Sequence, residues 1–443
     1  MFANDEDTIF AQASGVGKAA VAVFRVSGPT CAAALEALAP GAIFPDRTAV
    51  LRTLRNPASG EPLDRALVTR FAAPRSFTGE EMAELHVTGG RAVPAAVAGA
   101  LTKLAGLRLA EPGEFAWRAF LNGKIDLSEV EGLADLVEAE TEAQRRQAQR
   151  IAGGALRREC DAIRGLLIDA MAAIEAQLDF SDVEDAEGLT SESVRDAARR
   201  AVARIDRALA GARSAERLRS GFVVVIAGPP NVGKSTLMNA IAGRDVAITS
   251  PFAGTTRDPI EVALDLEGYP VVLVDTAGIR DSDDPVEREG VRRAQERAAH
   301  ADLTLWLDDG GGTGDGAVAG PTLKVRSKAD LARQGPGVST GDAEFAISAK
   351  TGEGIDALLA AIAERAVEGL WSAEPAVLTL ARHREAFSSA RRLLAPLVSA
   401  DPIEVELAAE EFRGAAAAMD RVVGRIGVED VLGQIFSRLC VGK

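Results

Sequence analysis

The sequence contains a glycine-rich segment whose residue types and spacing suit it to bind phosphate. The segment reads Gly228-Pro-Pro-Asn-Val-Gly233-Lys234-Ser235 and follows the apolar run Phe222 to Ala227. In a loop between a buried strand and a helix, backbone N–H groups and the helix N-terminus converge on an anion. The lysine ammonium can then bind the outer phosphate oxygens, and the serine hydroxyl can bind Mg²⁺. The sequence therefore predicts a nucleoside triphosphate site at this loop.

Two later segments are suited to sense the terminal phosphate. In Gly254-Thr-Thr256-Arg-Asp, Thr256 can bind Mg²⁺ only when the γ-phosphate is present. In Val271-Val-Leu-Val-Asp275-Thr-Ala-Gly278, a strand end presents Asp275 to the metal, and the Gly278 N–H can donate to the γ-phosphate. This order of motifs predicts a nucleotide-controlled switch.

Two short segments at predicted strand ends indicate the base. They are Ser327-Lys328-Ala-Asp330 and Ser348-Ala-Lys350. A carboxylate at Asp330 can accept hydrogen bonds from both N1–H and N2–H₂ of guanine, whereas adenine lacks this pair of donors. Ser327 stands where GTPases usually carry an asparagine that binds the base and braces the phosphate loop. We therefore expect weaker affinity with retained selectivity for guanine.

The residue that assists hydrolysis is not the usual one. Ile279 follows Gly278, and an apolar side chain cannot orient a water as the glutamine of Ras-type enzymes does. Two sources of help are visible: an acidic side chain between Asp281 and Glu287, and a cation held by Asn231 beside the phosphates. That the acidic residues only form a solvated loop is an equally open interpretation.

The composition predicts a soluble protein of two or three domains. The chain has 443 residues, of which 47% are hydrophobic and 26% charged, and its formal net charge is −15. No apolar run is long enough for a membrane span, the acidic N-terminus is unlike a signal peptide, and the three cysteines are far apart, so we expect a cytoplasmic location. The acidic charge predicts that any RNA contact is local or shared with a partner.

The pattern along the chain predicts a fold that combines α/β and all-α parts. Residues 1–122 are expected to form a mixed α/β domain, 123–220 a helical domain, 221–367 a doubly wound α/β unit and 368–443 a second helical part. Because helical segments flank the α/β unit, we expect that unit to be inserted into one helical domain whose halves pack together. The strands expected from apolar runs are Ala19 to Val26, Ala66 to Phe71, Phe222 to Ala227, Val271 to Asp275, Leu303 to Leu307, Thr322 to Val325 and Glu344 to Ser348.

With these motifs in this order, the whole chain resembles the tRNA-modification GTPase family MnmE, also called TrmE. Segments outside the α/β unit carry much of the resemblance. They are Phe24-Arg-Val-Ser-Gly28, Phe77-Thr-Gly-Glu-Glu-Met-Ala-Glu84-Leu, Pro112-Gly-Glu-Phe115, Arg118-Ala-Phe-Leu-Asn-Gly-Lys124 and the final Cys440-Val-Gly-Lys443. The resemblance implies a Ras-like P-loop GTPase domain between the helical halves.

The resemblance also implies a dimerising N-terminal domain that binds 5-formyl- or methylene-tetrahydrofolate. Arg25, Glu84, Lys124 and Lys443 stand at the matching positions. A carboxylate can accept from the donors of a pterin, while basic groups offset the glutamate charge of the folate. Cys440 matches a cysteine needed for modification in the family, although a buried apolar thiol is an alternative.

In the GTPase unit, the resemblance implies a K⁺ site and a catalytic acid. Asn231 is expected to bind K⁺, together with Ser250, Phe252 and Thr255, and Glu287 stands at the position of the water-orienting glutamate. Lys234 and Thr256 complete the catalytic group, and Ser235 and Thr256 the Mg²⁺ ligands. The full set expected to contact GTP is Asn231, Val232, Gly233, Lys234, Ser235, Thr236, Ser250, Pro251, Phe252, Ala253, Gly254, Thr255, Thr256, Asp275, Thr276, Ala277, Gly278, Ser327, Lys328, Asp330, Ser348, Ala349 and Lys350.

The implied function is GTP hydrolysis that drives domain opening and closing during tRNA modification. The homodimer is expected to act with the FAD-containing flavoprotein MnmG, as a heterotetramer, to place an aminomethyl or carboxymethylaminomethyl group on C5 of the wobble uridine of certain tRNAs. Two alternatives are a ribosome-assembly GTPase, whose phosphate loop would look the same, and a non-catalytic scaffold switched by nucleotide. Ser327 and Ile279 leave the scaffold open.

Overall fold

The chain forms two compact units, each of which collects several stretches of sequence. The computed structural model describes residues 7–179, 191–248, 261–275, 301–309, 320–331, 337–339, 344–370, 376–400, 403–426, 435, 436, 439 and 442. The first unit comprises Met1–Ala134, Ile151–Ala162 and Ala417–Lys443, and the second comprises Asp135–Arg150 and Ile163–Ala416.

A six-stranded sheet organises the first unit. Its strands are β1 (Thr8–Gln12), β2 (Val21–Ser27), β3 (Ala49–Arg55), β4 (Pro62–Phe71), β5 (Met82–Thr88) and β6 (Leu107–Leu109), in the order β3-β4-β5-β2-β1-β6. Of these strand pairs, only β1–β6 is parallel. Because side chains alternate across a strand, Ala22, Phe24 and Val26 of β2 enter the core, while Arg25 lies on the opposite face.

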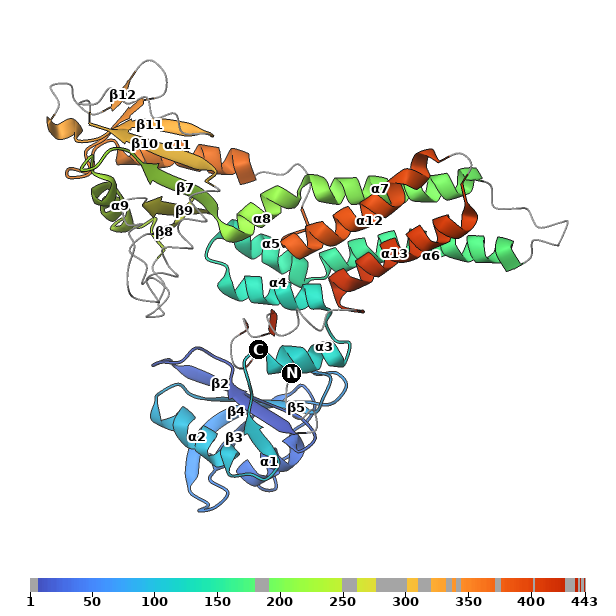
Figure 1. The fold of residues 1–443 in the computed structure, drawn as a ribbon. Helices are drawn as coiled ribbons and strands as arrows, with labels where there is room; N and C mark the ends of the chain where they lie inside the picture. The colour runs from blue at the N-terminus through green and yellow to red at the C-terminus, as the bar shows by residue number, and fades with distance from the viewer. Residues whose placement is uncertain are drawn as a thin grey trace, which may run out of the picture. The chain divides into compact units, whose positions relative to one another are not determined.

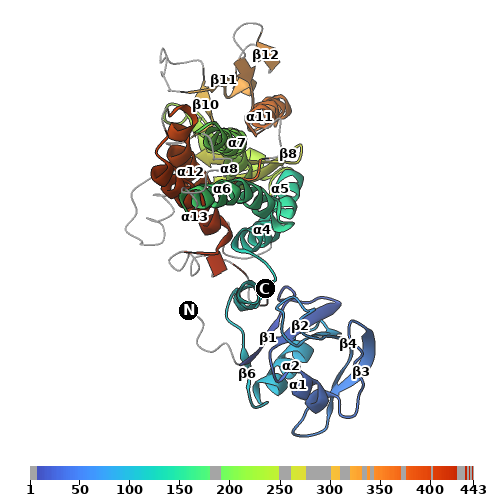
Figure 2. The same ribbon diagram turned by 90° about the vertical axis from the view of Figure 1, so that its right-hand side faces the viewer.

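Two helices cover the core face of this sheet. They are α1 (Cys31–Leu38) and α2 (Ala92–Thr102), and Leu35, Leu38, Val97 and Leu101 pack with the sheet in one buried cluster. Figure 2 shows both helices beside the sheet. The opposite face is therefore left to carry the polar side chains of β2 and β5.

The first unit also holds a short helix, α3 (Glu114–Leu121), and the end of the chain. Phe436 is fully buried and packs edge-on against Trp117, with ring centroids 5.2 Å apart. A Cβ on Gly113, whose φ is +75°, would lie 2.2 Å from the Phe436 carbonyl oxygen. Close approach at this glycine therefore lets the C-terminal segment pack against α3.

The second unit contains a seven-stranded sheet. Its strands are β7 (Phe222–Ala227), β8 (Glu261–Leu266), β9 (Tyr269–Asp275), β10 (Leu303–Asp308), β11 (Thr322–Arg326), β12 (Gly337–Ser339) and β13 (Glu344–Ala346), in the order β12-β13-β11-β10-β7-β9-β8. The two edge strands are antiparallel to their neighbours and the others are parallel. With α9 (Lys234–Ala242) and α11 (Ile355–Leu370) packed on it, this sheet confirms the doubly wound α/β unit.

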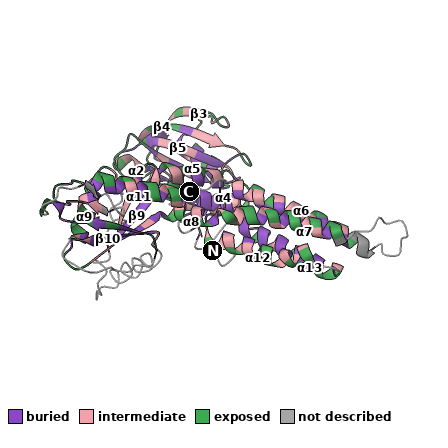
Figure 3. Cartoon of the chain, turned by 90° about the horizontal axis from the view of Figure 1, so that it is seen from above, coloured by how far each residue is buried: buried purple, intermediate pink, exposed green. Residues whose placement is uncertain are grey.

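Helices from both sides of the α/β unit in sequence pack together. The helical elements are α4 (Leu127–Glu138), α5 (Glu142–Ala152), α6 (Ala155–Asp179), α7 (Ser191–Ala210), α8 (Ala212–Ser220), α12 (Ala381–Ser399) and α13 (Val405–Val423). Within the second unit α7 lies along α12 (Figure 1), and buried residues form stripes on both helices (Figure 3). The Arg391 guanidinium of α12 also pairs with the Asp206 carboxylate of α7. The expected insertion of the α/β unit into a helical domain is thus observed.

Most strands of the second unit agree with the sequence-based expectations. The predicted strands in the second unit match β7, β9, β10, β11 and β13, whereas β8 and β12 were not expected. The four predicted segments are not tested by the two compact units, because the helical segments contribute to both. Among the residues that the structure describes, no helix combines the length and apolar character needed to cross a bilayer.

We expect replacement of Gly132 by alanine to destabilise the first unit. A Cβ there would lie 2.3 Å from the backbone nitrogen of Ala152, so α4 and α5 would have to separate. Overpacking of this kind costs about 1–3 kcal/mol. The matched control is Gly165→Ala in α6, where a Cβ meets nothing within 4 Å and alanine should add about 0.5–1 kcal/mol of helix stability. Calorimetric melting should move in opposite directions for the two variants, and equal shifts would contradict this account.

Candidate functional site

The predicted phosphate loop connects β7 to α9, and its glycines are required by its backbone. Gly228 has φ +145°, and a Cβ there would lie 2.4 Å from the Leu307 carbonyl oxygen of β10. Gly233, at the N-cap of α9, has φ +105°. Both conformations are unfavourable for other residues. The loop therefore ends with the α9 N-terminus, where orphan backbone N–H groups favour an anion.

Two catalytic-type side chains meet where β7 and β9 end. The Ser235 hydroxyl donates to Asp275, with 2.6 Å between Oγ and Oδ2, and Asp275 is 2% exposed. A hydroxyl and a carboxylate held this close are the hard oxygen donors that Mg²⁺ prefers. Lys234 is also buried, and its ammonium donates to the carbonyls of Gly228 and Pro229 at 2.9 Å each. Lys234 is thus held on the loop that would receive the phosphates.

The predicted base-binding segments follow β11 and β13. The Ser348 hydroxyl, fully buried, donates to Asp330 Oδ1 at 2.8 Å, which orients an exposed carboxylate. Lys328 has φ +55° and pairs with Asp309 at 3.0 Å. Ala349 and Lys350 directly follow Ser348, and Lys350 is exposed. The structure therefore brings Asp330 and Ser348 together from separate strands.

Ser327 performs one of the two tasks expected of an asparagine at its position. Its hydroxyl donates to the Val232 carbonyl of the phosphate loop at 2.6 Å, and the residue is 7% exposed. Direct contact between the base-side segment and the phosphate loop is thus retained with a shorter side chain. Sequence alone could not show this, because it depends on how closely the ends of β7 and β11 approach.

Asn231 is exposed in the phosphate loop with φ +61°, and Thr236 is exposed in the first turn of α9. The remaining predicted site residues lie outside the described residues. They are Ser250, Pro251, Phe252, Ala253, Gly254, Thr255, Thr256, Thr276, Ala277, Gly278, Glu287, Cys440 and Lys443.

A second group of predicted site residues lies on the outer face of the first unit's sheet. Arg25 and Glu84 are directly opposed on β2 and β5, with 2.9 Å between Nη2 and Oε1. The Arg25 guanidinium lies over the Phe77 ring, 5.2 Å from its centroid, and donates to the Gly442 carbonyl at 3.3 Å. Lys124 donates instead to the Pro74 carbonyl at 2.9 Å. The C-terminal segment thus reaches Arg25, while Lys124 lies against the loop that carries Phe77.

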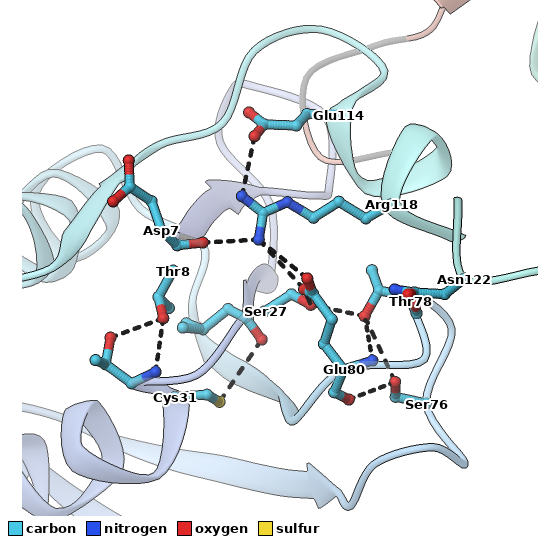
Figure 4. Close-up of polar contacts among 12 residues, drawn as sticks. Asp7, Thr8, Ser27, Cys31, Ser76, Thr78, Glu80, Glu114, Arg118 and Asn122 are labelled. Atoms are coloured by element: carbon cyan, nitrogen blue, oxygen red, sulfur yellow. Dashed lines mark hydrogen bonds and ion pairs between the residues drawn. The ribbon is translucent and has the colours of Figure 1, made fainter. Parts of the chain in front are cut away.

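A buried polar network beneath this loop was not singled out by the sequence analysis (Figure 4). Arg118, 2% exposed, donates to the Asp7 carbonyl at 2.7 Å, to Glu80 at 3.2 Å and to Glu114 at 3.2 Å. Glu80 in turn accepts from the Ser27 hydroxyl at 2.7 Å. The network therefore ties β2, the loop before β5, and α3 together. Its residues lie within or beside the motifs quoted above, but only the structure shows that they are buried.

Burial and hydrogen bonding oppose each other at Glu114. Burial alone would raise the pKa of this carboxyl. Hydrogen bonds from Arg108 and from the Glu111 N–H, with the charges of Arg108 and Arg118, bring the pKa below its usual value. The network therefore holds Glu114 as a carboxylate that can bind both arginines.

The sheet order and the loop between β7 and α9 place the second unit in the class of P-loop GTPases. The MnmE helical domain model matches residues 127–440, and the model of the GTP-binding protein TrmE N-terminus matches residues 8–124. The chain is 49% identical to the tRNA modification GTPase MnmE of Rhodopseudomonas palustris (strain BisB5) over 99% of both chains. It is 52% identical to that of Methylobacterium sp. (strain 4-46) over 99% of this chain and 100% of the relative. The chain belongs to the tRNA modification GTPase MnmE family.

Solved structures add a more distant likeness. A variant of Aquifex aeolicus Era bound to GDP·AlF4⁻ is 24% identical, covers 39% of this chain and 66% of its own, and has a TM-score of 0.24. The family relation itself favours a tRNA-modification GTPase over the ribosome-assembly alternative.

We expect Ser327→Ala to weaken GTP and GDP binding alike. The substitution removes the hydrogen bond to Val232, which is worth about 0.5–1.5 kcal/mol, or roughly 2- to 10-fold in Kd. The guanine preference should persist, because Asp330 and Ser348 are unchanged. Fluorescent-nucleotide titration measures both effects, with Ser220→Ala, an exposed serine of α8, as the control. Unchanged affinity, or a loss of guanine preference, would count against the bracing role.

Proposed function

We propose that this chain is a K⁺-dependent GTPase that, with the flavoprotein MnmG, adds an aminomethyl or carboxymethylaminomethyl group to C5 of the wobble uridine of certain tRNAs. The observation that carries the proposal is the 2.6 Å contact between Ser235 and Asp275 at the end of the phosphate loop. It places metal-binding oxygens beside Lys234, in a chain that belongs to the MnmE family.

The residues of the phosphate site fit Mg²⁺. Ser235 and Asp275 supply oxygen donors, and Thr256 is expected to add a third when the γ-phosphate is present. A bound magnesium ion would neutralise charge that develops on the phosphate oxygens. Lys234 adds a positive charge on the same side, while Asp330 selects guanine. These assignments divide phosphate binding from base recognition along one edge of the sheet.

Catalysis in this proposal depends on an acid and a monovalent cation rather than on a glutamine. Glu287 orients the attacking water, because Ile279 cannot do so. Asn231, Ser250, Phe252 and Thr255 would hold K⁺, and a bound ion would supply positive charge where other GTPases use an arginine. The exposed position of Asn231 in the phosphate loop supports this role, because its side chain is accessible to an ion beside the phosphates. Hydrolysis then drives opening and closing of the GTPase units in the homodimer.

The N-terminal domain is proposed to bind 5-formyl- or methylene-tetrahydrofolate. The Glu84 carboxylate can accept from pterin N–H donors, and Arg25, Lys124 and Lys443 supply positive charge. The close Arg25–Glu84 pair and the aromatic face of Phe77 support a site for a flat polar ring. A bound folate would supply the one-carbon unit, and Cys440 is proposed to act in the modification step.

The charge of the chain and its family support the proposed partner and location. A net charge of −15 disfavours strong binding of RNA by this chain alone, so much of the tRNA contact is assigned to the partner. The heterotetramer with MnmG would also contribute the FAD. The proposed location is the cytoplasm, where tRNA, folate and K⁺ are all present.

GTP turnover should depend on K⁺. Exchange of K⁺ for Na⁺ should lower kcat on the order of 10²-fold, because the catalytic positive charge is lost. Asn231→Ala should turn over equally slowly in both salts, whereas Asn239→Ala, an exposed asparagine of α9, should behave as the unmodified protein. Phosphate-release assays measure this. Turnover indifferent to the ion would overturn the K⁺ mechanism.

Cells that lack this protein should lose the wobble-uridine modification. Restoring the gene should return it, and Glu84→Gln should not, because an amide offers a single acceptor oxygen to the pterin donors. Glu61→Gln, an exposed change in the same domain, serves as the control. Mass spectrometry of tRNA nucleosides reads the result. Unchanged wobble uridines in the deletion strain would end the tRNA-modification proposal.

A further inference from the structure

The nucleotide site and the contacts with the helical segments lie at opposite ends of the strands of the seven-stranded sheet. The phosphate loop follows the last residue of β7, and Asp275 ends β9. β7, β9 and β10 run parallel, so their first residues lie together at the amino ends of the strands. The helical segments of the second unit therefore meet the GTPase sheet one strand length away from the nucleotide.

Asp302, directly before β10, makes three polar contacts at the amino ends of these strands. Its Oδ1 pairs with Arg217 Nε of α8 at 2.8 Å, and its Oδ2 accepts from the Val223 N–H of β7 at 2.9 Å. The Asp302 N–H also donates to the Val223 carbonyl at 2.9 Å. The Asp302 side chain is 6% exposed and that of Arg217 is 48% exposed. A buried carboxylate thus joins two strand beginnings to α8.

Two other charged side chains of α8, Glu216 and Arg219, bind helices of the second unit. Glu216 Oε1 pairs with Arg384 Nε of α12 at 2.9 Å, and Arg219 Nε pairs with Asp135 Oδ1 of α4 at 2.8 Å. The Ala215 carbonyl accepts from Gln147 of α5 at 3.2 Å. Within the second unit, α8 therefore binds the GTPase sheet through Arg217 and three different helices through its other residues.

The connection at Asp302 also lies close in sequence to the nucleotide-sensing segment. Residues 276–300, which carry Gly278 and Glu287, end just before Asp302. A second contact joins the β8–β9 turn to the helical segments, because the Ala143 N–H of α5 donates to the Gly268 carbonyl at 3.0 Å. That contact is one backbone hydrogen bond, whereas the Arg217–Asp302 contact joins two charged side chains, of which Asp302 is buried.

We propose that the Arg217–Asp302 pair is the joint through which α8 carries nucleotide-dependent movement of the GTPase unit into the helical domain. The inference rests on the proposed function, in which GTP binding and hydrolysis move these parts. Arg217 is a positioning residue in this scheme, since it lies at the sheet edge opposite the phosphate loop. Removal of the Arg217 guanidinium leaves Asp302 buried with the Val223 N–H as its remaining described donor. The amino ends of β7 and β10 then lose their charged contact with α8.

Spin labels on the full-length protein can test the joint. The labels are placed at Ala203→Cys in α7 and Glu364→Cys in α11, both exposed, in a Cys440→Ser background. Cys31 and Cys160 are buried, and burial raises the pKa of Cys31 to about 12, so these thiols should resist labelling. The distance between the labels is measured by electron–electron double resonance without nucleotide and with a non-hydrolysable GTP analogue, Mg²⁺ and K⁺.

The nucleotide-dependent change in distance should fall by at least half in Arg217→Gln, while basal GTP turnover is preserved and circular dichroism shows that the variant stays folded at the temperature of the measurement. Arg213→Gln, an exposed arginine of the same helix, should keep the full change. Arg217→Lys retains the charge and should restore much of it, which a purely space-filling role would not require. Asp302→Asn should reproduce the loss if Arg217→Gln is poorly folded.

The outcomes separate the joint from the function it serves. A full distance change in a folded Arg217→Gln or Asp302→Asn protein would refute the joint and leave the proposed function intact. No distance change in the parent protein, with GTP bound, would refute nucleotide-driven movement and the joint with it. Loss of the change in Arg213→Gln as well would show that α8 responds to any surface charge, which also contradicts a specific pair.

Discussion

The parallel sheet of the GTPase unit is the constraint on which the other arrangements depend. A strand rises about 3.3 Å per residue, so the seven residues of β9 span roughly 20 Å between its ends. Phosphate and metal groups belong at the carboxyl ends, where loops and helix N-termini converge on an anion. The connection to the helical segments of the same unit is left at the amino ends. The contacts that Asp302 and Gly268 make with the helical segments therefore lie about one strand length from the nucleotide site.

The contacts at the carboxyl and amino ends of the strands follow from this geometry. At the carboxyl edge, close approach of neighbouring strand ends brings Ser235 to Asp275, and Ser327 to the Val232 carbonyl. At the amino edge, the same approach lets Asp302 bind both Val223 and Arg217. Each contact joins residues far apart in sequence.

In the first unit, charged side chains lie both on the outer face of the sheet and in a buried network below it. Arg118, Glu114 and Glu80 are stable there because each has an opposite charge or a hydrogen-bond partner at short range. Above them, Arg25 and Glu84 share one face because β2 and β5 are antiparallel neighbours in register. A chain with a large net negative charge can thus still present a locally basic group to an anionic ligand.

The sequence allowed several parts of the fold to be predicted, for identifiable physical reasons. β7, β9 and β10 were recognisable because strands buried on both faces are apolar throughout. β8, an edge strand of mixed polarity reading Glu-Val-Ala-Leu-Asp-Leu, lacks that signal, and so does β3. The phosphate loop was recognisable because Gly228 and Gly233 adopt positive φ values that other residues rarely adopt. The network around Arg118 was not, because a charged residue in a helix is usually exposed.

By itself, the amino-acid sequence determined the chemical classes of the sites: a phosphate loop, a guanine-selecting carboxylate at Asp330, and the arginine and glutamate of the N-terminal domain. These depend on residue type and local spacing, which the chain carries directly. Tertiary structure alone decided that Ser327 reaches the phosphate loop, that Arg25 meets the Gly442 carbonyl, and that Arg217 meets Asp302. Such contacts join residues brought together by strand order and helix packing, and no local pattern in the chain specifies those distances.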